Sequence, residues 1–248
     1  RIYSQMGYVF AKHIFGIKGS YAVDPQKGAV VMTLTTQGDV PIHYTLDGSE
    51  PTAASPRYTG PVEIGKSARF RATALREGGE NASYSREFAF SKSTGRPAVL
   101  NTKPNDSYTF EGASLLVDGY HSRPVFTSGA WLGYLDEPLD VTIDMGGEQS
   151  YRSVELETLA EKGDWIFPPS SVTVWVSDNG TDFTEVASVA VPEAKAGDAD
   201  GIGRYRMQFP ETSARYLKVV AQNAAAIPAW HPGAGSKGFL FVDEVVVE

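Results

Sequence analysis

Short stretches of the chain alternate apolar and polar residues, which is the pattern of β-strands that bury one face. Residues 42–46, 69–74 and 139–145 follow this alternation. Sustained helical periodicity is absent from the sequence, so the pattern predicts an all-β fold. Further strands are predicted at 172–177, 183–191, 205–209, 216–221 and 239–247.

Glycine, proline and asparagine divide these strands and predict where the chain turns. Asp47-Gly48 follows the first alternating stretch, Gly146-Gly147 is expected to end the strand at 139–145, and Asp178-Asn179-Gly180 predicts a hairpin turn. Ser91–Gly95 has the composition of a linker. The expected parts are a tail at 1–18, packed on another part of the protein, a small β-sandwich at 19–92 and a larger one at 93–248.

Charge and composition exclude some classes of function. The formal net charge is −8 and the sequence pI is about 5.1, whereas nucleic-acid binding depends on clustered basic residues. The acidic charge also disfavours docking to anionic membranes, and no apolar run reaches the length of a transmembrane helix. The sequence has no cysteine, which removes disulfides and thiolate chemistry.

Two segments resemble known families. Residues 42–52, IHYTLDGSEPT, followed by Tyr58-Thr59-Gly60-Pro61, resemble the C-terminal domain of chitobiase-like β-hexosaminidases. Residues 98–248 resemble the discoidin, or coagulation factor C-type, sandwich of family 32 carbohydrate-binding modules, as found at the end of bacterial family 20 hexosaminidases. The resemblance implies an immunoglobulin-like sandwich followed by a discoidin-like jelly roll, both lying after a catalytic domain. It is carried by LVDG at 116–119, WLGY at 131–134, VTIDMG at 141–146, WIFPP at 165–169, VSDNG at 176–180 and FVDEV at 241–245.

Catalysis is not expected from this chain. Family 20 enzymes use an Asp-Glu pair at the mouth of a barrel, and no barrel fits the predicted strands. Asp243-Glu244 is the one tempting pair, but adjacent residues on a strand point to opposite faces and do not share one substrate. The fragment is therefore interpreted as non-catalytic, with a β-N-acetylhexosaminidase as the parent enzyme.

The discoidin resemblance also implies one structural calcium ion. Discoidin-like modules bind it with the Asp of an Asp-Gly turn, a nearby Ser or Thr and a Glu of the last strand, together with backbone carbonyls. These positions correspond to Asp118, Ser122 and Glu244. The alternative is that Asp118 caps a turn and Glu244 is solvated.

Aromatic side chains in loops are the candidate sugar-binding residues, because flat rings stack on the C–H faces of pyranoses. Two loops carry them, with Trp165 and Phe167 in one and Trp230 and His231 in the other. Trp165 or Phe167 could instead cap the interior, and Trp131 and Trp175 are expected in the core because they lie in strand-like patterns. His121 and Arg123, after Asp118, are expected to add polar contacts.

The function predicted from the sequence is carbohydrate binding by an accessory region that keeps a secreted glycoside hydrolase near its substrate. The expected partners are glycans containing GlcNAc, GalNAc or galactose and the catalytic domain of the same protein, and the expected location is extracytoplasmic. The alternative is that both sandwiches only support the catalytic barrel, in which case an exposed apolar patch is expected.

Overall fold

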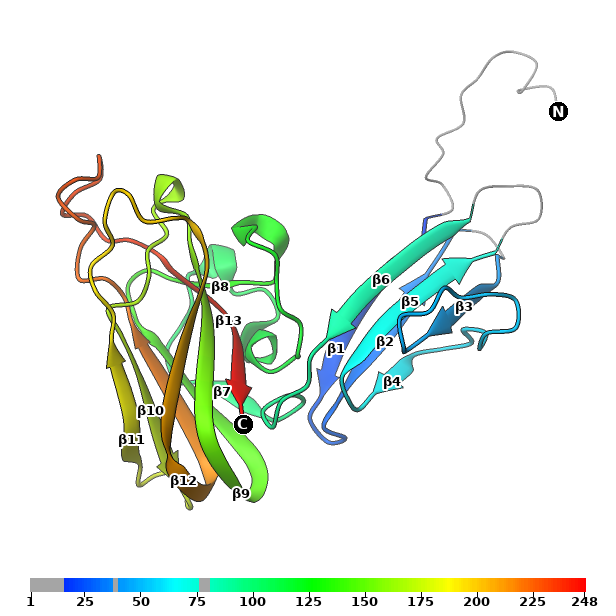
Figure 1. Cartoon of the computed structure of the whole chain (residues 1–248), viewed down its shortest axis with the longest axis horizontal. Helices are drawn as coiled ribbons and strands as arrows, with labels where there is room; N and C mark the ends of the chain where they lie inside the picture. The colour runs from blue at the N-terminus through cyan, green and yellow to red at the C-terminus, as the bar shows by residue number, and fades with distance from the viewer. Residues whose placement is uncertain (1–15, 38–39, 76–80) are drawn as a thin grey trace, which may run out of the picture. The chain divides into compact units, whose positions relative to one another are not determined.

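A computed structural model describes residues 16–37, 40–75 and 81–248. Most of the expected tail at 1–18 therefore lies outside the described residues. The chain divides into two compact units, one built mainly from residues 30–88 and the other from residues 89–248 (Figure 1). The expected boundary between residues 92 and 93 stays a prediction. In the described ranges, no helix is long and apolar enough to cross a membrane.

The smaller unit is a β-sandwich of two sheets that each have three strands among the described residues. One sheet has the order β1-β2-β4, with β1 (Lys18–Asp24), β2 (Ala29–Thr35) and β4 (Val62–Ile64). The other has the order β3-β5-β6, with β3 (Ile42–Thr45), β5 (Ala68–Ala74) and β6 (Ala82–Phe88). The apolar residues Phe70, Ala72 and Ala74 of β5 are buried. In the stretch 42–46 only Ile42 is buried, whereas Tyr44 is half-buried and Leu46 is exposed. Arg69 is exposed and Arg71 is half-buried, whereas Thr73 is buried, so the alternation locates the inner face of β5.

The larger unit is also all-β, which confirms the fold class expected from the sequence. Its strands have the order β11-β10-β12-β9-β13-β8, and β7 pairs with β9. Four short 3-10 helices lie between strands of residues 89–248, at Asp106–Tyr108, Gly112–Leu116, Phe126–Ser128 and Lys162–Asp164. The strands are β7 (Ala98–Leu100), β8 (Leu132–Tyr134), β9 (Leu139–Ala160), β10 (Ser171–Ser177), β11 (Thr184–Ala190), β12 (Gly201–Gln222) and β13 (Leu240–Val247).

Strands β9 and β12 are each 22 residues long and take part in both layers of this sandwich (Figure 1). The first part of β9 pairs with β7, whereas its last part pairs with β13, and β12 follows β9 along most of its length. Irregular register at 208–212 and 214–216 of β12 lets the pair bend from one layer into the other. Core residues of both layers form one hydrophobic cluster, which includes Val141, Leu156, Val174, Leu217 and Val245.

Three local expectations were wrong. Gly146-Gly147 lies inside β9 and does not end a strand, because β12 pairs with β9 on both sides of it. Trp175 is only half-buried, since Val172, Val174 and Val176 occupy the inward positions of β10 and Trp175 alternates with them. Ser91–Gly95 is a packed turn rather than an open linker, because the buried Ser93 donates its hydroxyl hydrogen to the Val245 carbonyl.

Candidate functional site

Three loops of the larger unit come together and carry the side chains of Trp165, Phe167, Trp230 and His231. They connect β9 to β10, β11 to β12 and β12 to β13. The Trp230 indole N–H donates to the Ala194 carbonyl at 2.9 Å. The imidazole of His231 reaches the Lys162 carbonyl at 2.9 Å, and the Phe167 N–H donates to the Phe239 carbonyl at 2.9 Å. Hydrogen bonds therefore fix each loop to at least one of the others.

His231 is the centre of this loop cluster. Its Nδ1 accepts the Gly233 backbone N–H at 3.0 Å, so Nε2 must carry the hydrogen that is donated to Lys162. The imidazole is only 9% exposed, and three rings surround it at centroid distances of 5.5–6.1 Å, those of Trp165, Phe167 and Trp230. With both ring nitrogens occupied, His231 orders the loops around it and has no nitrogen left for a ligand.

Trp165 and Trp230 are the exposed members of the cluster, at 42% and 40% of their surface. Trp165 follows the 3-10 helix at Lys162–Asp164 and adopts a left-handed backbone conformation, with φ of 64°. Residue 233, which packs against the Trp165 indole, must be glycine, because a β-carbon there would come within 2.8 Å of the ring. The buried Lys162 side chain forms an ion pair with Asp200, which anchors this turn. Phe167, by contrast, is 1% exposed and forms part of the floor between the loops.

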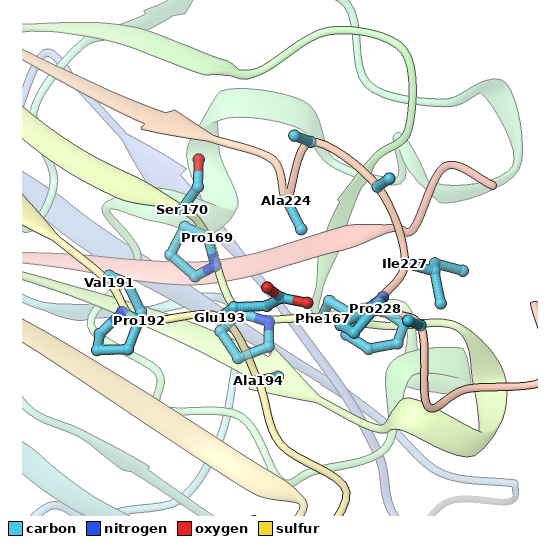
Figure 2. A pocket seen from close by; sticks show the side chains of 14 residues that line it. Phe167, Pro169, Ser170, Val191, Pro192, Glu193, Ala194, Ala224, Ile227 and Pro228 are labelled. Atoms are coloured by element: carbon cyan, nitrogen blue, oxygen red, sulfur yellow. The ribbon is translucent and has the colours of Figure 1, made fainter. Parts of the chain in front are cut away.

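A cavity of about 390 Å³ lies between the same three loops (Figure 2), and Ala229, the residue before Trp230, is part of its lining. Glu193 is the one charged residue in its lining. Neither Glu193 nor Ala194 was singled out from the sequence, where only Pro192 marks this stretch as a loop. The other lining residues are Phe167, Pro168, Pro169, Ser170, Val191, Pro192, Ala194, Ala224, Ala225, Ala226, Ile227, Pro228 and Ala229.

His121 and Arg123 take part in a different network. His121 Nδ1 lies 3.0 Å from an oxygen of the fully buried Glu157, at an angle poor for a hydrogen bond, so the contact is an ion pair when His121 is protonated. Arg204 donates to the other Glu157 oxygen at 2.5 Å. The contact with Glu157 raises the pKa of His121. Arg123 is exposed, and its backbone carbonyl accepts the Trp131 indole hydrogen at 2.9 Å. Within residues 81–248, no hydrogen bond or ring contact joins His121 or Arg123 to Trp165, Trp230 or His231.

A cluster of buried carboxyl groups lies near the end of the chain. Asp118, Asp243 and Glu244 are all at most 3% exposed. An extra residue in β13, between Val242 and Val245, forms a bulge that turns Asp243 and Glu244 into the interior. Ser122 gives both its backbone and its hydroxyl hydrogen to Asp243, and the Gly119 N–H donates to Glu244 at 3.2 Å. Burial, together with the negative charge of Asp118, raises the pKa of both Asp243 and Glu244.

Comparison with known families decides the classification of the chain. The model described as F5/8 type C domain matches residues 101–237, more than half of the 248 residues. This chain belongs to the F5/8 type C domain family. The model described as chitobiase/beta-hexosaminidase C-terminal domain matches residues 19–86. Both resemblances drawn from the sequence are thus confirmed.

Several solved structures are similar to the F5/8 type C domain. Chitosan-binding module 1 from a chitosanase/glucanase of Paenibacillus sp. IK-5 is 17% identical with a TM-score of 0.42, over 64% of this chain and 98% of that one. CpGH89CBM32-5 from Clostridium perfringens, solved with GalNAc-β-1,3-galactose, is 16% identical with a TM-score of 0.41, over 61% and 94%. SpGH29 is 15% identical with a TM-score of 0.41, over 63% of this chain and 27% of that one. No curated protein sequence matches the chain.

The carboxyl cluster of the F5/8 type C domain can be compared with the calcium site that the resemblance implies. One oxygen of Glu244, Oε2, is buried and has no hydrogen-bond partner, and carboxylate oxygens are ligands that Ca²⁺ prefers. Asp118 and Glu244 therefore fit such an ion if backbone carbonyls complete its shell. Ser122 fits less well, because its hydroxyl already bonds Asp243 and the Ala130 carbonyl. No group of three or more His, Cys, Asp or Glu side chains in the described ranges has the arrangement of a metal site.

Proposed function

We propose that the F5/8 type C domain of this chain binds carbohydrate through Trp165 and Trp230. The observation that carries the proposal is the exposure of these two indoles on separate loops that are joined through one buried histidine. Exposed indole rings held by a fixed framework suit the C–H face of a pyranose, and a rigid site loses little entropy when a ligand binds. Such a platform is shallow, so millimolar affinity for a single sugar is expected.

The proposal extends to the whole chain as a non-catalytic accessory region of an extracytoplasmic glycoside hydrolase. The match of residues 19–86 to the chitobiase/beta-hexosaminidase C-terminal domain supports a β-N-acetylhexosaminidase as the parent enzyme. A glycan-binding domain attached to such an enzyme raises the local concentration of substrate without changing the chemical step. The smaller sandwich is then a connecting domain between the catalytic domain and the glycan-binding domain.

Substitution of either exposed tryptophan by alanine is expected to weaken sugar binding at least about tenfold, because each ring supplies stacking area that no neighbour replaces. Titration of the chain with N-acetylglucosamine, N-acetylgalactosamine, galactose and short glycans, followed by calorimetry, measures the effect on Trp165→Ala and Trp230→Ala. Trp175→Phe is the matched control, since Trp175 lies on β10, away from the three loops.

Two results would contradict carbohydrate binding at this site. One is wild-type affinity in both alanine variants. The other is no binding of any of these sugars at millimolar concentration by a folded chain, which would favour the alternative that both domains support the catalytic barrel.

We also propose that Asp118 and Glu244 hold a structural Ca²⁺ ion. Burial, together with the charges of Asp118 and Asp243, raises the pKa of Glu244, and a bound divalent cation would compensate this cost of the ionised carboxylate. At a hundredfold excess of Ca²⁺ over its dissociation constant, the free energy of unfolding should rise by about 2.7 kcal/mol.

Urea denaturation with Ca²⁺, with Mg²⁺ and with a chelator measures this stabilisation. Glu244→Gln should remove it, whereas Asp144→Asn, which changes a partly exposed aspartate paired with Arg215, should keep it. Equal stability with Ca²⁺ and with chelator in the unmodified chain would refute the calcium proposal.

A further inference from the structure

The cavity beside Trp230 has a lining with few side-chain hydrogen-bond donors. Four of its fourteen residues are prolines, which have no N–H. The N–H groups of Phe167, Ser170, Val191 and Ile227 are already used in backbone hydrogen bonds. Ser170 has the one side-chain donor in the lining, and its hydroxyl donates to the Asn223 carbonyl at 2.9 Å. The side chains of the lining therefore offer a carboxylate or an amide carbonyl of a ligand no cationic partner and no uncommitted hydroxyl.

Glu193 gives the same cavity one strong acceptor. Figure 2 shows the Glu193 side chain extending toward Phe167, with its carboxylate in the space that the loops enclose. Within the described part of the chain, Glu193 has no ion-pair or hydrogen-bond partner. The whole chain carries a formal charge of −8, so its field also favours a cationic ligand.

Apart from Ser170, the rest of the lining is made of proline and alanine side chains together with Val191, Ile227 and the phenyl ring of Phe167. These groups present C–H surface and no further charge. An occupant that matches the whole cavity has a compact apolar body and one group that only donates hydrogen bonds. A primary ammonium meets the second condition, because it has three donors and no acceptor.

We propose that this cavity is a subsite for a protonated amino sugar, a 2-amino-2-deoxyhexose unit whose ammonium pairs with Glu193. The inference rests on the proposed carbohydrate binding and specifies its ligand class. The amino sugar places its ring against the proline and alanine side chains, and a neighbouring unit of the same glycan stacks on Trp230. Trp230 also donates to the carbonyl of Ala194, the residue after Glu193, so a hydrogen bond joins the loop of Trp230 to the loop of Glu193.

The test compares glucosamine oligosaccharides with fully N-acetylated oligosaccharides of the same length. We expect the amine form to bind the unmodified chain about fivefold more tightly at low salt, and this preference to fall as salt screens the ion pair. Glu193→Gln should remove the preference and leave the affinity for the N-acetylated form within about twofold. Glu185→Gln is the matched control, because Glu185 is an exposed glutamate on β11, outside the lining of the cavity.

A second variant fills the cavity without changing charge. Ala224 points into the space in Figure 2 and lies in the loop after β12, so Ala224→Leu should weaken binding of the amine form and leave the fold intact. Equal affinity for both forms, or an amine preference that survives Glu193→Gln, would overturn the subsite while carbohydrate binding stands. Loss of binding in Trp165→Ala and Trp230→Ala, without any effect of Glu193→Gln or Ala224→Leu, would likewise overturn the subsite and leave carbohydrate binding in place. No binding of either form would overturn both proposals.

Discussion

Replacing Trp131 by alanine should lower the free energy of unfolding of the F5/8 type C domain by about 4 kcal/mol. Trp131 has no exposed surface and packs with Leu159, Ile166 and Phe241. Its indole hydrogen also bonds the Arg123 carbonyl at 2.9 Å, so the substitution both opens a cavity and removes the donor to this carbonyl. Urea denaturation followed by tryptophan fluorescence measures the change, because the remaining tryptophans, at 165, 175 and 230, all lie in this domain.

The control for this prediction is Trp175→Ala, which removes an indole that is only half-buried. It should cost well under half as much, since less of the ring leaves contact with the protein. Equal losses for the two variants would show that burial of Trp131 is not what stabilises the domain.

Arg204→Ala should lower the free energy of unfolding by about 3 kcal/mol at neutral pH, because it removes one partner of a buried carboxylate. Glu157 is fully buried between Arg204 and His121. Burial raises its pKa, but the contacts with His121 and Arg204 outweigh burial and leave the pKa of Glu157 below its usual value of 4.5. This stabilisation is therefore present above pH 4.5 and lost as the pH falls through the lowered pKa of the folded protein.

Denaturation at several pH values tests the role of Arg204, and the loss caused by Arg204→Ala should shrink as the pH falls below 4.5. Arg206→Ala is the matched control on the same strand, where Arg206 pairs with the largely exposed Glu248. It should cost less than about 1 kcal/mol. A loss for Arg204→Ala that is small, or that does not change with pH, would contradict the assigned role of this ion pair.

The local pattern of the sequence predicted strands better than it predicted their connections. The alternation at 139–145 correctly located the start of β9, and the turn at Asp178-Asn179-Gly180 lies between β10 and β11. The local pattern did not reveal that β9 continues through Gly146-Gly147. This continuation depends on pairing with β12, which is about 60 residues further along the chain. The prediction of Trp175 as a core residue is wrong for a related reason. Its aromatic bulk suggests burial, but the valines on either side of it occupy the inner face of β10.

The candidate site was predicted in part. The loops of Trp165 and Trp230 lie together, but the sequence did not show that His231 joins them or that the loop of Glu193 completes a cavity. Such relations depend on backbone carbonyls and on contacts between distant loops, which leave no local pattern. Ser122 illustrates the same limit, because its partner is Asp243 rather than the neighbouring Asp118.

The long antiparallel ladder of β9 and β12 also governs how this domain can fold. Its register runs from Leu139 opposite Ala221 to Ala160 opposite Gly201, so every pair closes a loop of at least 40 residues. Closing such loops costs chain entropy before any contact is gained, which places the domain among slow folders that take milliseconds to seconds. Because both layers share these two strands, neither layer is complete without the other. The two layers of the domain should therefore form in one cooperative step, late in synthesis, after residue 222 has become available to pair.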